Sequence, residues 1–168
     1  MRKLAILLRA VNVGGTGKLP MQDLRSICLD AGFAQPKTLL ASGNVVVETE
    51  LAAGKVRRIM EDALETYAGK PVGVFVLDLQ AMAEIHACHP FGDHPPSQCG
   101  ILFVDDLPAA SDLQAAKGLK DEVLTAGPGV VYILFPNGMG KSKLVTPGST
   151  SGTMRNLNTV TKLLAMLK

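Results

Sequence analysis

Aromatic side chains are scarce in this sequence of 168 residues, which contains no tryptophan, two tyrosines and five phenylalanines. RNA-recognition domains bind bases by stacking them on exposed aromatic residues of their sheet. The strand predicted here over residues 44–48 contains only asparagine, valine and glutamate. The sequence therefore argues against a domain that reads RNA by base stacking.

An excess of charge of one sign is also lacking. Seventeen lysines and arginines stand against 15 aspartates and glutamates, which gives a net charge of +2, and charged residues occur in clusters of two or three at most. Proteins that hold duplex DNA commonly make about 6–10 phosphate contacts. We therefore do not expect nucleic acid to be a main partner.

Long apolar runs are missing as well. Arg9 interrupts the first run, residues 4–8, after five residues, whereas the apolar part of a secretion signal takes about 7–15. A membrane-spanning helix needs about 18 or more apolar residues. We expect a cytoplasmic protein with no membrane partner.

Cysteine is rare, and its spacing fits neither a redox pair nor a disulfide framework. The three cysteines are odd in number, which indicates reduced thiols of the kind found in the cytosol. Several potential metal ligands lie close together in the sequence, but no Cys-x-x-Cys spacing occurs among them and two of them flank prolines. These residues are His86, Cys88, His89, His94 and Cys99. We expect no metal site and no cofactor.

The first half of the chain has the hydrophobic pattern of a β-α-β-β-α-β plait. An apolar strand over 4–11 leads to a helix that begins at Pro20 and ends at Gly32. Strands over 38–40 and 45–48 enclose a turn, and a second helix over 56–67 precedes a strand over 72–77. This order predicts an antiparallel sheet with both helices on one face, as in ferredoxin-like domains.

The second half is predicted to repeat the first roughly. A helix over 79–88 leads into a proline-rich loop, which marks the boundary between two lobes, residues 1–92 and 93–168, within one compact unit. Strands are predicted over 100–104 and 130–135, with weaker ones over 122–125 and 141–145. Ser111 is the expected cap of a helix over 111–119. The fold class is therefore α+β, with two plait-like lobes and mainly antiparallel sheets.

A final amphipathic helix is expected to dock. Leu157, Val160, Leu164 and Leu167 line one of its sides. Burying four such side chains stabilises a fold by about 6–12 kcal/mol, at roughly 1.5–3 kcal/mol each. That value is comparable to the net stability of a whole domain, about 5–15 kcal/mol.

Two glycine-rich segments resemble phosphate-binding loops, but neither fits a known motif. In the first, Lys18 is followed by leucine instead of serine or threonine, and Asn12 stands where a P-loop needs its first glycine. The second, residues 138–142, has Phe135 at that place and is predicted to be a hairpin turn. For the first segment, a looser anion nest and a plain connection both stay open.

Residues 147–156 form the best candidate site in the sequence. They place hydroxyl groups and glycines ahead of the final helix, with Arg155 in or near its first turn. Backbone N–H groups, hydroxyls and the guanidinium could hold an anion together. The alternative is that Thr153 or Asn156 caps the helix while Arg155 pairs with a carboxylate.

Five blocks of sequence follow one another in an order that is specific to one family. They are residues 8–15, 19–21 with 24 and 25, 31–33, 42–46, and 153–160 with 162 and 163. Through these blocks the chain resembles the uncharacterised bacterial family known as domain of unknown function 1697, over nearly its whole length. The resemblance implies an α+β fold with two plait-like lobes and no known activity. The chain departs from the family in having Ala10 where a glycine is expected and Leu157 where tryptophan is usual.

The family blocks also indicate which residues could bind a ligand. We expect residues 9–15, the turn at residues 42–44 and a helix start at Arg155 to form one cleft that binds a small phosphorylated or carboxylated molecule. The candidate ligand-binding residues are Arg9, Asn12, Gly14, Gly15, Ser42, Gly43, Asn44, Arg155, Asn156 and Asn158. No general base is convincing, so no catalytic residue is predicted and the sequence leaves open whether the protein is an enzyme.

Two other functions stay open. In the first, the same residues form a structural polar network, and the protein is an interaction module or a homodimer. In the second, Lys18, Lys141, Lys143 and Arg155 bind single-stranded nucleic acid weakly, in a salt-dependent way.

Overall fold

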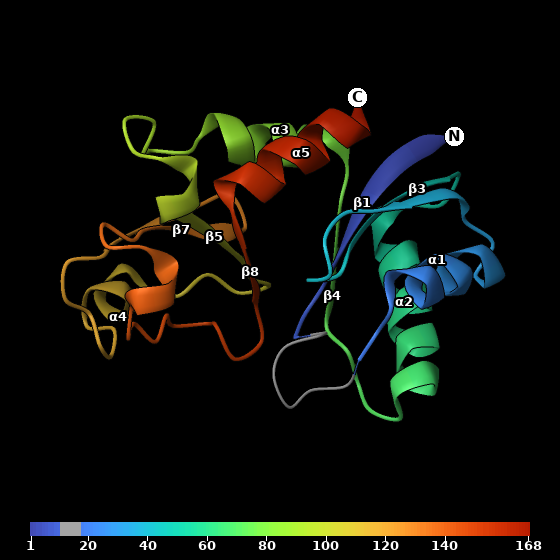
Figure 1. The fold of residues 1–168 in the computed structure, drawn as a ribbon, viewed down its shortest axis with the longest axis horizontal. Coiled ribbons are helices and arrows are strands. Elements are labelled where there is room, and N and C mark those ends of the chain that lie inside the picture. The colour runs from blue at the N-terminus through green and yellow to red at the C-terminus, as the bar shows by residue number, and fades with distance from the viewer. Residues whose placement is uncertain (11–17) are drawn as a thin grey trace. The chain divides into compact units, whose positions relative to one another are not determined.

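The computed structural model describes residues 1–10 and 18–168 and divides the chain into two compact units. Unit 1 comprises Met1–Ala81 with Leu163–Lys168, and unit 2 comprises Met82–Lys162. Each unit contains a four-stranded antiparallel sheet (Figure 1). The predicted α+β fold with two plait-like lobes is confirmed. These units are groups of residues that pack together, and unit 1 includes the C-terminal residues Leu163–Lys168. The lobes predicted as continuous stretches of the chain, residues 1–92 and 93–168, stay a prediction.

Unit 1 has the predicted order of elements. They are β1 (Arg2–Leu8), α1 (Met21–Asp30), β2 (Ala34–Thr38), β3 (Asn44–Thr49), α2 (Ala53–Ala68) and β4 (Val74–Leu77). The strands lie in the order β2-β3-β1-β4. Each neighbouring pair is antiparallel, as in a ferredoxin-like plait.

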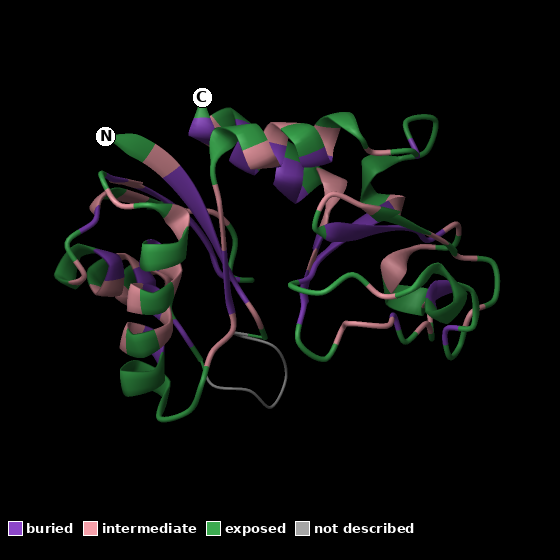
Figure 2. Cartoon of the chain, turned by 180° about the vertical axis from the view of Figure 1, so that it is seen from behind, coloured by how far each residue is buried: buried purple, intermediate pink, exposed green. Residues whose placement is uncertain are grey.

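The core of unit 1 lies between the sheet and its two helices. Alternate residues of β1 face the helices, among them Leu4 and Ile6, and both are buried. They pack in one cluster with Leu24 of α1 and Met60 of α2. Figure 1 shows both helices on the same face of this sheet, and Figure 2 shows that α2 turns an exposed side away from it. Gly69 ends α2 in the left-handed conformation, with a φ of 73°, which glycine adopts without strain.

The edge strand β2 of unit 1 is irregular. Its pairing with β3 shifts between Ala34 and Lys37, and Gln35 has a φ of 51°. Pro36 lacks an N–H group and cannot donate to a neighbouring strand. The outer edge of this sheet is therefore interrupted along its length.

Unit 2 repeats the strand order of unit 1, as predicted. Helix α3 (Leu79–Ala87) leads into it, and its strands are β5 (Cys99–Phe103), β6 (Val123–Gly127), β7 (Val130–Leu134) and β8 (Thr153–Asn156). They lie in the order β6-β7-β5-β8, which corresponds to β2-β3-β1-β4. Helix α4 (Ala110–Gln114) stands where unit 1 has α1, and the short 3-10 turn η2 (Met139–Lys141) stands where unit 1 has α2. A further 3-10 turn, η1, covers Pro96–Gln98.

Both faces of the second sheet are covered. On one face, Leu102 and Val131 pack in a cluster with Leu113 of α4 and Met139 of η2. On the other face, the hydroxyl of Tyr132 donates a hydrogen bond of 2.6 Å to the carbonyl oxygen of Ile85 in α3. Burial is the main reason that the pKa of Tyr132 is raised to about 12.

Three local predictions in unit 2 are wrong. Helix α4 is shorter than the predicted 111–119, and its cap is Ala109 instead of Ser111. Residues 141–145 form no strand, because the Ser142 hydroxyl accepts a bond of 3.2 Å from the backbone N–H of Leu144 and competes with strand pairing. Only the isolated bridge between Lys117 and Val145 forms there. Residues 138–142 accordingly make a 3-10 turn and no hairpin.

The final helix docks as predicted. Helix α5 (Leu157–Leu167) buries three of the four predicted side chains, Val160, Leu164 and Leu167, and also Leu163, each with 9% or less of its surface exposed. The fourth predicted side chain, Leu157, is half-buried. No helix within residues 1–10 and 18–168 is long and apolar enough to cross a membrane.

Candidate functional site

The end of β1 brings together two segments that the sequence placed in one site. The backbone N–H of Leu8 donates to the carbonyl oxygen of Gly43 over 2.8 Å, and the N–H of Arg9 donates to Gly73 over 2.9 Å. Arg9 therefore lies at the same end of the sheet as the turn that contains Ser42. Of the first predicted segment, Arg9 thus lies near this turn, and residues 11–15 lie outside the described residues.

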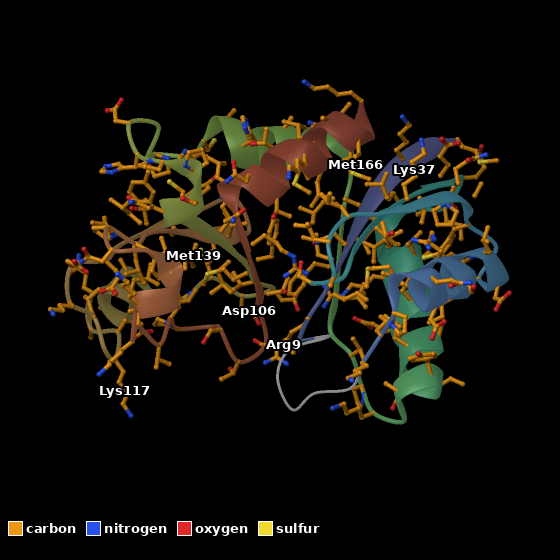
Figure 3. All side chains as sticks on the ribbon, viewed as in Figure 1. Arg9, Lys37, Asp106, Lys117, Met139 and Met166 are labelled. Atoms are coloured by element: carbon orange, nitrogen blue, oxygen red, sulfur yellow. The ribbon has the colours of Figure 1, made fainter. Side chains whose placement is uncertain are left out.

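The side chain of Arg9 lies along Gly73. A β-carbon added to Gly73 would be 3.1 Å from the Cβ and 3.3 Å from the Cδ of Arg9. The Nε atom of Arg9 is buried, and no residue that the structure describes accepts a hydrogen bond from it. Figure 3 shows Arg9 at the end of β1. Sequence reasoning missed Gly73, although a glycine just ahead of the strand that neighbours β1 was a usable signal.

Asn44 has a structural role in this turn. It is fully buried, and its side-chain amide donates to the carbonyl oxygen of Leu39 over 2.7 Å and to the hydroxyl of Ser42 over 3.0 Å. The backbone carbonyl oxygen of Asn44 accepts a bond of 2.9 Å from the backbone N–H of Leu39. Asn44 thus closes the connection between β2 and β3 and holds Ser42 in place.

Ala10 follows Arg9 in a conformation that is unusual for alanine. Its φ is 54°, in the left-handed region that costs an ordinary residue about 1 kcal/mol or more. This is the position at which the resemblance to the family leads us to expect glycine. The other predicted residues of this loop, Asn12, Gly14 and Gly15, lie outside the described residues.

The sequence predicted that Arg155 begins a helix. In the structure Arg155 instead lies in strand β8, opposite Ile101 of β5. Pairing with β5 keeps the chain extended up to Asn156, so that α5 begins at Leu157. The guanidinium is buried and donates to the Thr153 hydroxyl over 2.7 Å and to a backbone carbonyl over 2.9 Å. Burial lowers the pKa of Arg155 from its usual value to about 10, so the group stays charged at neutral pH.

Asn156 caps the final helix. It is one of the two residues, Thr153 and Asn156, that the sequence offered as caps. Its side-chain oxygen accepts bonds from the backbone N–H and the hydroxyl of Thr159, over 3.0 Å and 3.2 Å. Asn158 lies exposed in the first turn of the helix. Asn156 is thus engaged within the fold, and binding by either asparagine stays a prediction.

The candidate residues fall into two groups. Arg9 and residues 42–44 belong to unit 1, and Arg155, Asn156 and Asn158 belong to unit 2. The cleft shared by all of them stays a prediction.

The histidines near residue 90 have local partners. A nitrogen of His86 lies 3.2 Å from the Thr161 hydroxyl, and the ring of His89 packs edge-on against Phe91 and Tyr132. The Nε2 atom of His89 is buried and has no hydrogen-bond partner among the described residues. Among all residues that the structure describes, no group of three or more histidine, cysteine or acidic side chains could hold a metal ion.

The cysteines of the core are poor nucleophiles. Burial raises the pKa of the Cys28 thiol to about 12, and it also raises the pKa of Cys99. A thiol reacts as its thiolate. At neutral pH these two residues are therefore protonated and serve in packing.

Comparison with known proteins agrees with the fold and leaves the activity open. A family model described as "Protein of unknown function (DUF1697)" matches residues 1–132. A solved structure, that of the conserved bacterial protein SP0830 from Streptococcus pneumoniae, is similar with a TM-score of 0.80 and 24% sequence identity. The match covers 99% of this chain and 98% of that one, and at this identity it shows the fold alone. A search of curated proteins finds no match.

Proposed function

The chain belongs to the DUF1697 family of proteins of unknown function, and we propose that its Arg9 binds a small phosphorylated or carboxylated ligand at the end of β1. The observation that carries this proposal is the buried Nε of Arg9, which has no acceptor among the described residues. An oxygen of a bound anion would provide that acceptor.

The energetics favour an external partner for this group. A buried donor without an acceptor costs about 1–3 kcal/mol, and more when the group is charged. The backbone N–H of Arg9 already bonds to Gly73, and contact with Gly73 fixes the aliphatic part of the side chain. A planar guanidinium held in this way matches the two oxygens of a carboxylate or phosphate.

The neighbouring turn supports the same proposal. The bond from Leu8 to Gly43 holds residues 42–44 at the end of β1, which Arg9 directly follows. Asn44 fixes the Ser42 hydroxyl, which is on the exposed side of this turn. In this proposal Arg9 supplies charge, Ser42 orients the ligand and Asn44 holds the turn.

Thermal unfolding of the full chain with nucleoside monophosphates, sugar phosphates and dicarboxylates tests the proposal. A ligand at 100 times its Kd stabilises a fold by about 2.7 kcal/mol, which is measurable as a rise in Tm. We expect at least one anion to stabilise the wild type, and Arg9→Met to weaken its binding by about tenfold or more. Arg58→Met, which removes an exposed arginine of α2, is the matched control.

The stability of the unliganded variant separates binding from structure. Removal of a half-buried guanidinium whose Nε has no acceptor among the described residues should leave the ligand-free Tm of Arg9→Met equal to that of the wild type or higher. A large loss of stability would instead favour a structural role. The proposal fails if no anion stabilises the wild type, or if the stabilisation is the same in Arg9→Met.

A further inference from the structure

We propose that unit 2 contains a second binding site, for a phosphorylated sugar or polyol, in a cavity beside η2. The cavity has a volume of about 540 Å³, within the range of roughly 300–1,000 Å³ that is usual for small-molecule sites. One wall is the segment ahead of β6, and the other is the start of the connection between β7 and β8. This is the connection in which η2 replaces the helix present in unit 1.

Backbone contacts hold the two walls together. The N–H of Val145 donates to the carbonyl oxygen of Lys117 over 2.7 Å. Gly118 lies so close to the other wall that an added β-carbon would be 2.1 Å from the carbonyl oxygen of Lys143. These main-chain contacts fix the distance between the two walls, and the exposed lysine side chains of the lining project from them.

The acidic residues of the lining are tied into the walls. The carboxylate of Glu122 accepts bonds from the Ser142 hydroxyl and from the backbone N–H of Lys120, and these bonds lower its pKa. The side-chain amide of Asn137 donates to one oxygen of Asp121. The other oxygen, Oδ1, has no donor among the described residues and can accept a bond from a ligand hydroxyl.

Three lysines supply positive charge to the same cavity. Lys120, Lys141 and Lys143 line it, and none of them forms an ion pair with another described residue. Three ammonium groups against two carboxylates leave the lining with a net charge of +1. Lysine ammonium groups bind phosphate as point charges, so we assign the phosphate of the ligand to them.

The aromatic content of the cavity favours a sugar over a nucleobase. Phe135 is the aromatic residue of the described lining, and it is 5% exposed. Its ring is therefore not available as a platform on which a base could stack. Hydroxyl groups, in contrast, find acceptors in Asp121 and Asn137, next to the lysines that would hold the phosphate.

Isothermal titration calorimetry of the full chain tests the site with glycerol 3-phosphate, ribose 5-phosphate and glucose 6-phosphate. Inorganic phosphate and glucose are the reference ligands, and a dT-rich oligonucleotide tests single-stranded nucleic acid. We expect at least one sugar or polyol phosphate to bind about tenfold more tightly than either reference. The proposal fails if none does, or if the oligonucleotide binds more tightly than all of them.

Variants locate the binding. The double variant Lys141→Met/Lys143→Met should weaken the affinity at least tenfold, while Lys117→Met should leave it unchanged. Lys117, which is labelled in Figure 3, is exposed and adjacent in sequence to the lining, and it does not itself line the cavity. Equal affinity in the double variant and the wild type overturns the proposal.

Arg9→Met distinguishes this site from the one proposed in unit 1. Binding in the cavity predicts that Arg9→Met leaves the affinity for the sugar phosphate unchanged. Loss of binding in Arg9→Met, with the double lysine variant unaffected, would assign the ligand to Arg9 and overturn the cavity proposal. Loss in the double lysine variant alone supports the cavity and leaves the Arg9 proposal to its own test.

Discussion

Arg9 and Gly73 are packed directly against each other, and no side chain larger than hydrogen fits at position 73 without a shift of the arginine. An added β-carbon would be 3.1 Å from the Cβ of Arg9 and 3.3 Å from its Cδ. The backbone bond of 2.9 Å from Arg9 to Gly73 holds the two residues at this distance. The position of the guanidinium is therefore coupled to the absence of a side chain at Gly73.

The first prediction follows from this contact. Gly73→Ala should move the Arg9 side chain by a few tenths of an ångström and weaken anion binding by about 3- to 10-fold, since charged groups act through their geometry. Ligand titrations monitored by thermal unfolding measure the effect. Gly54→Ala is the control, because a β-carbon there meets nothing within 4 Å. Unchanged binding in Gly73→Ala would mean that the placement of Arg9 by Gly73 is unimportant for the ligand.

The second prediction concerns the residue after Arg9. Ala10 has a φ of 54°, so Ala10→Gly should relieve strain and raise the free energy of unfolding by up to about 1 kcal/mol, after the larger entropy of the unfolded glycine chain is subtracted. Urea denaturation measures this value. Ala165→Gly, in the regular helix α5, should lower stability by about 0.5–1 kcal/mol. If both variants lose stability equally, Ala10 is not strained.

The third prediction concerns the turn beside Arg9. Asn44→Ala removes the hydrogen bonds from its side-chain amide to Leu39 and Ser42, and leaves the carbonyl oxygen of Leu39 without its side-chain donor. We expect a loss of about 1–3 kcal/mol in the free energy of unfolding. Asn158→Ala changes an exposed asparagine and should stay within about 0.5 kcal/mol of the wild type. A neutral Asn44→Ala would show that the turn does not need this amide.

The fourth prediction is a dependence on pH. Burial, and to a smaller extent the charge of His86, lower the pKa of His89. Below a pH of about 6.5 the unfolded chain takes up this proton before the folded protein does, so acidification lowers the free energy of unfolding until the folded-state pKa is reached. Urea denaturation between about pH 7.5 and 5.5 should show a shallower decline in His89→Gln than in the wild type.

The control for this pH series is His94→Gln, which replaces an exposed histidine of the same loop. Its decline should follow that of the wild type. If His89→Gln declines as steeply as the wild type, the neutral form of His89 does not stabilise the fold.

Elements with strong local signals could be predicted from the sequence. The apolar stripe of α2 predicted a helix over residues 56–67, which lies within the observed Ala53–Ala68, and the stripe of α5 correctly predicted burial of Val160 and Leu167. The repeated strand order could also be anticipated, because alternation of strands and helices restricts the possible topologies.

The parts that failed depend on contacts distant in sequence. Arg155 lies in a strand because β5 is available as its partner, and nothing in the neighbouring residues indicates this. Residues 141–145 carry a strand-like pattern, but the side chain of Ser142 bonds to the adjacent backbone. The lysine-lined cavity depends on the shortened connection between β7 and β8, whose path could not be derived from periodicity.

The candidate site could be predicted only in part, because some of its contacts are also distant in sequence. The proximity of Arg9 to the turn at Ser42 follows from strand pairing in a plait, which the sequence could supply. The functions of Asn44 and Asn156 could not be separated from ligand binding until their hydrogen bonds were known. Both asparagines hold turns or helix ends in the fold.

The irregular edge strand β2 has a consequence for self-association. Open sheet edges are templates on which further strands add, and they lead to polymerisation and fibril growth. Here the register shift between Ala34 and Lys37, together with Pro36, removes the continuous row of donors that an incoming strand would need. Continuous addition of a further strand is therefore disfavoured at this edge of the sheet.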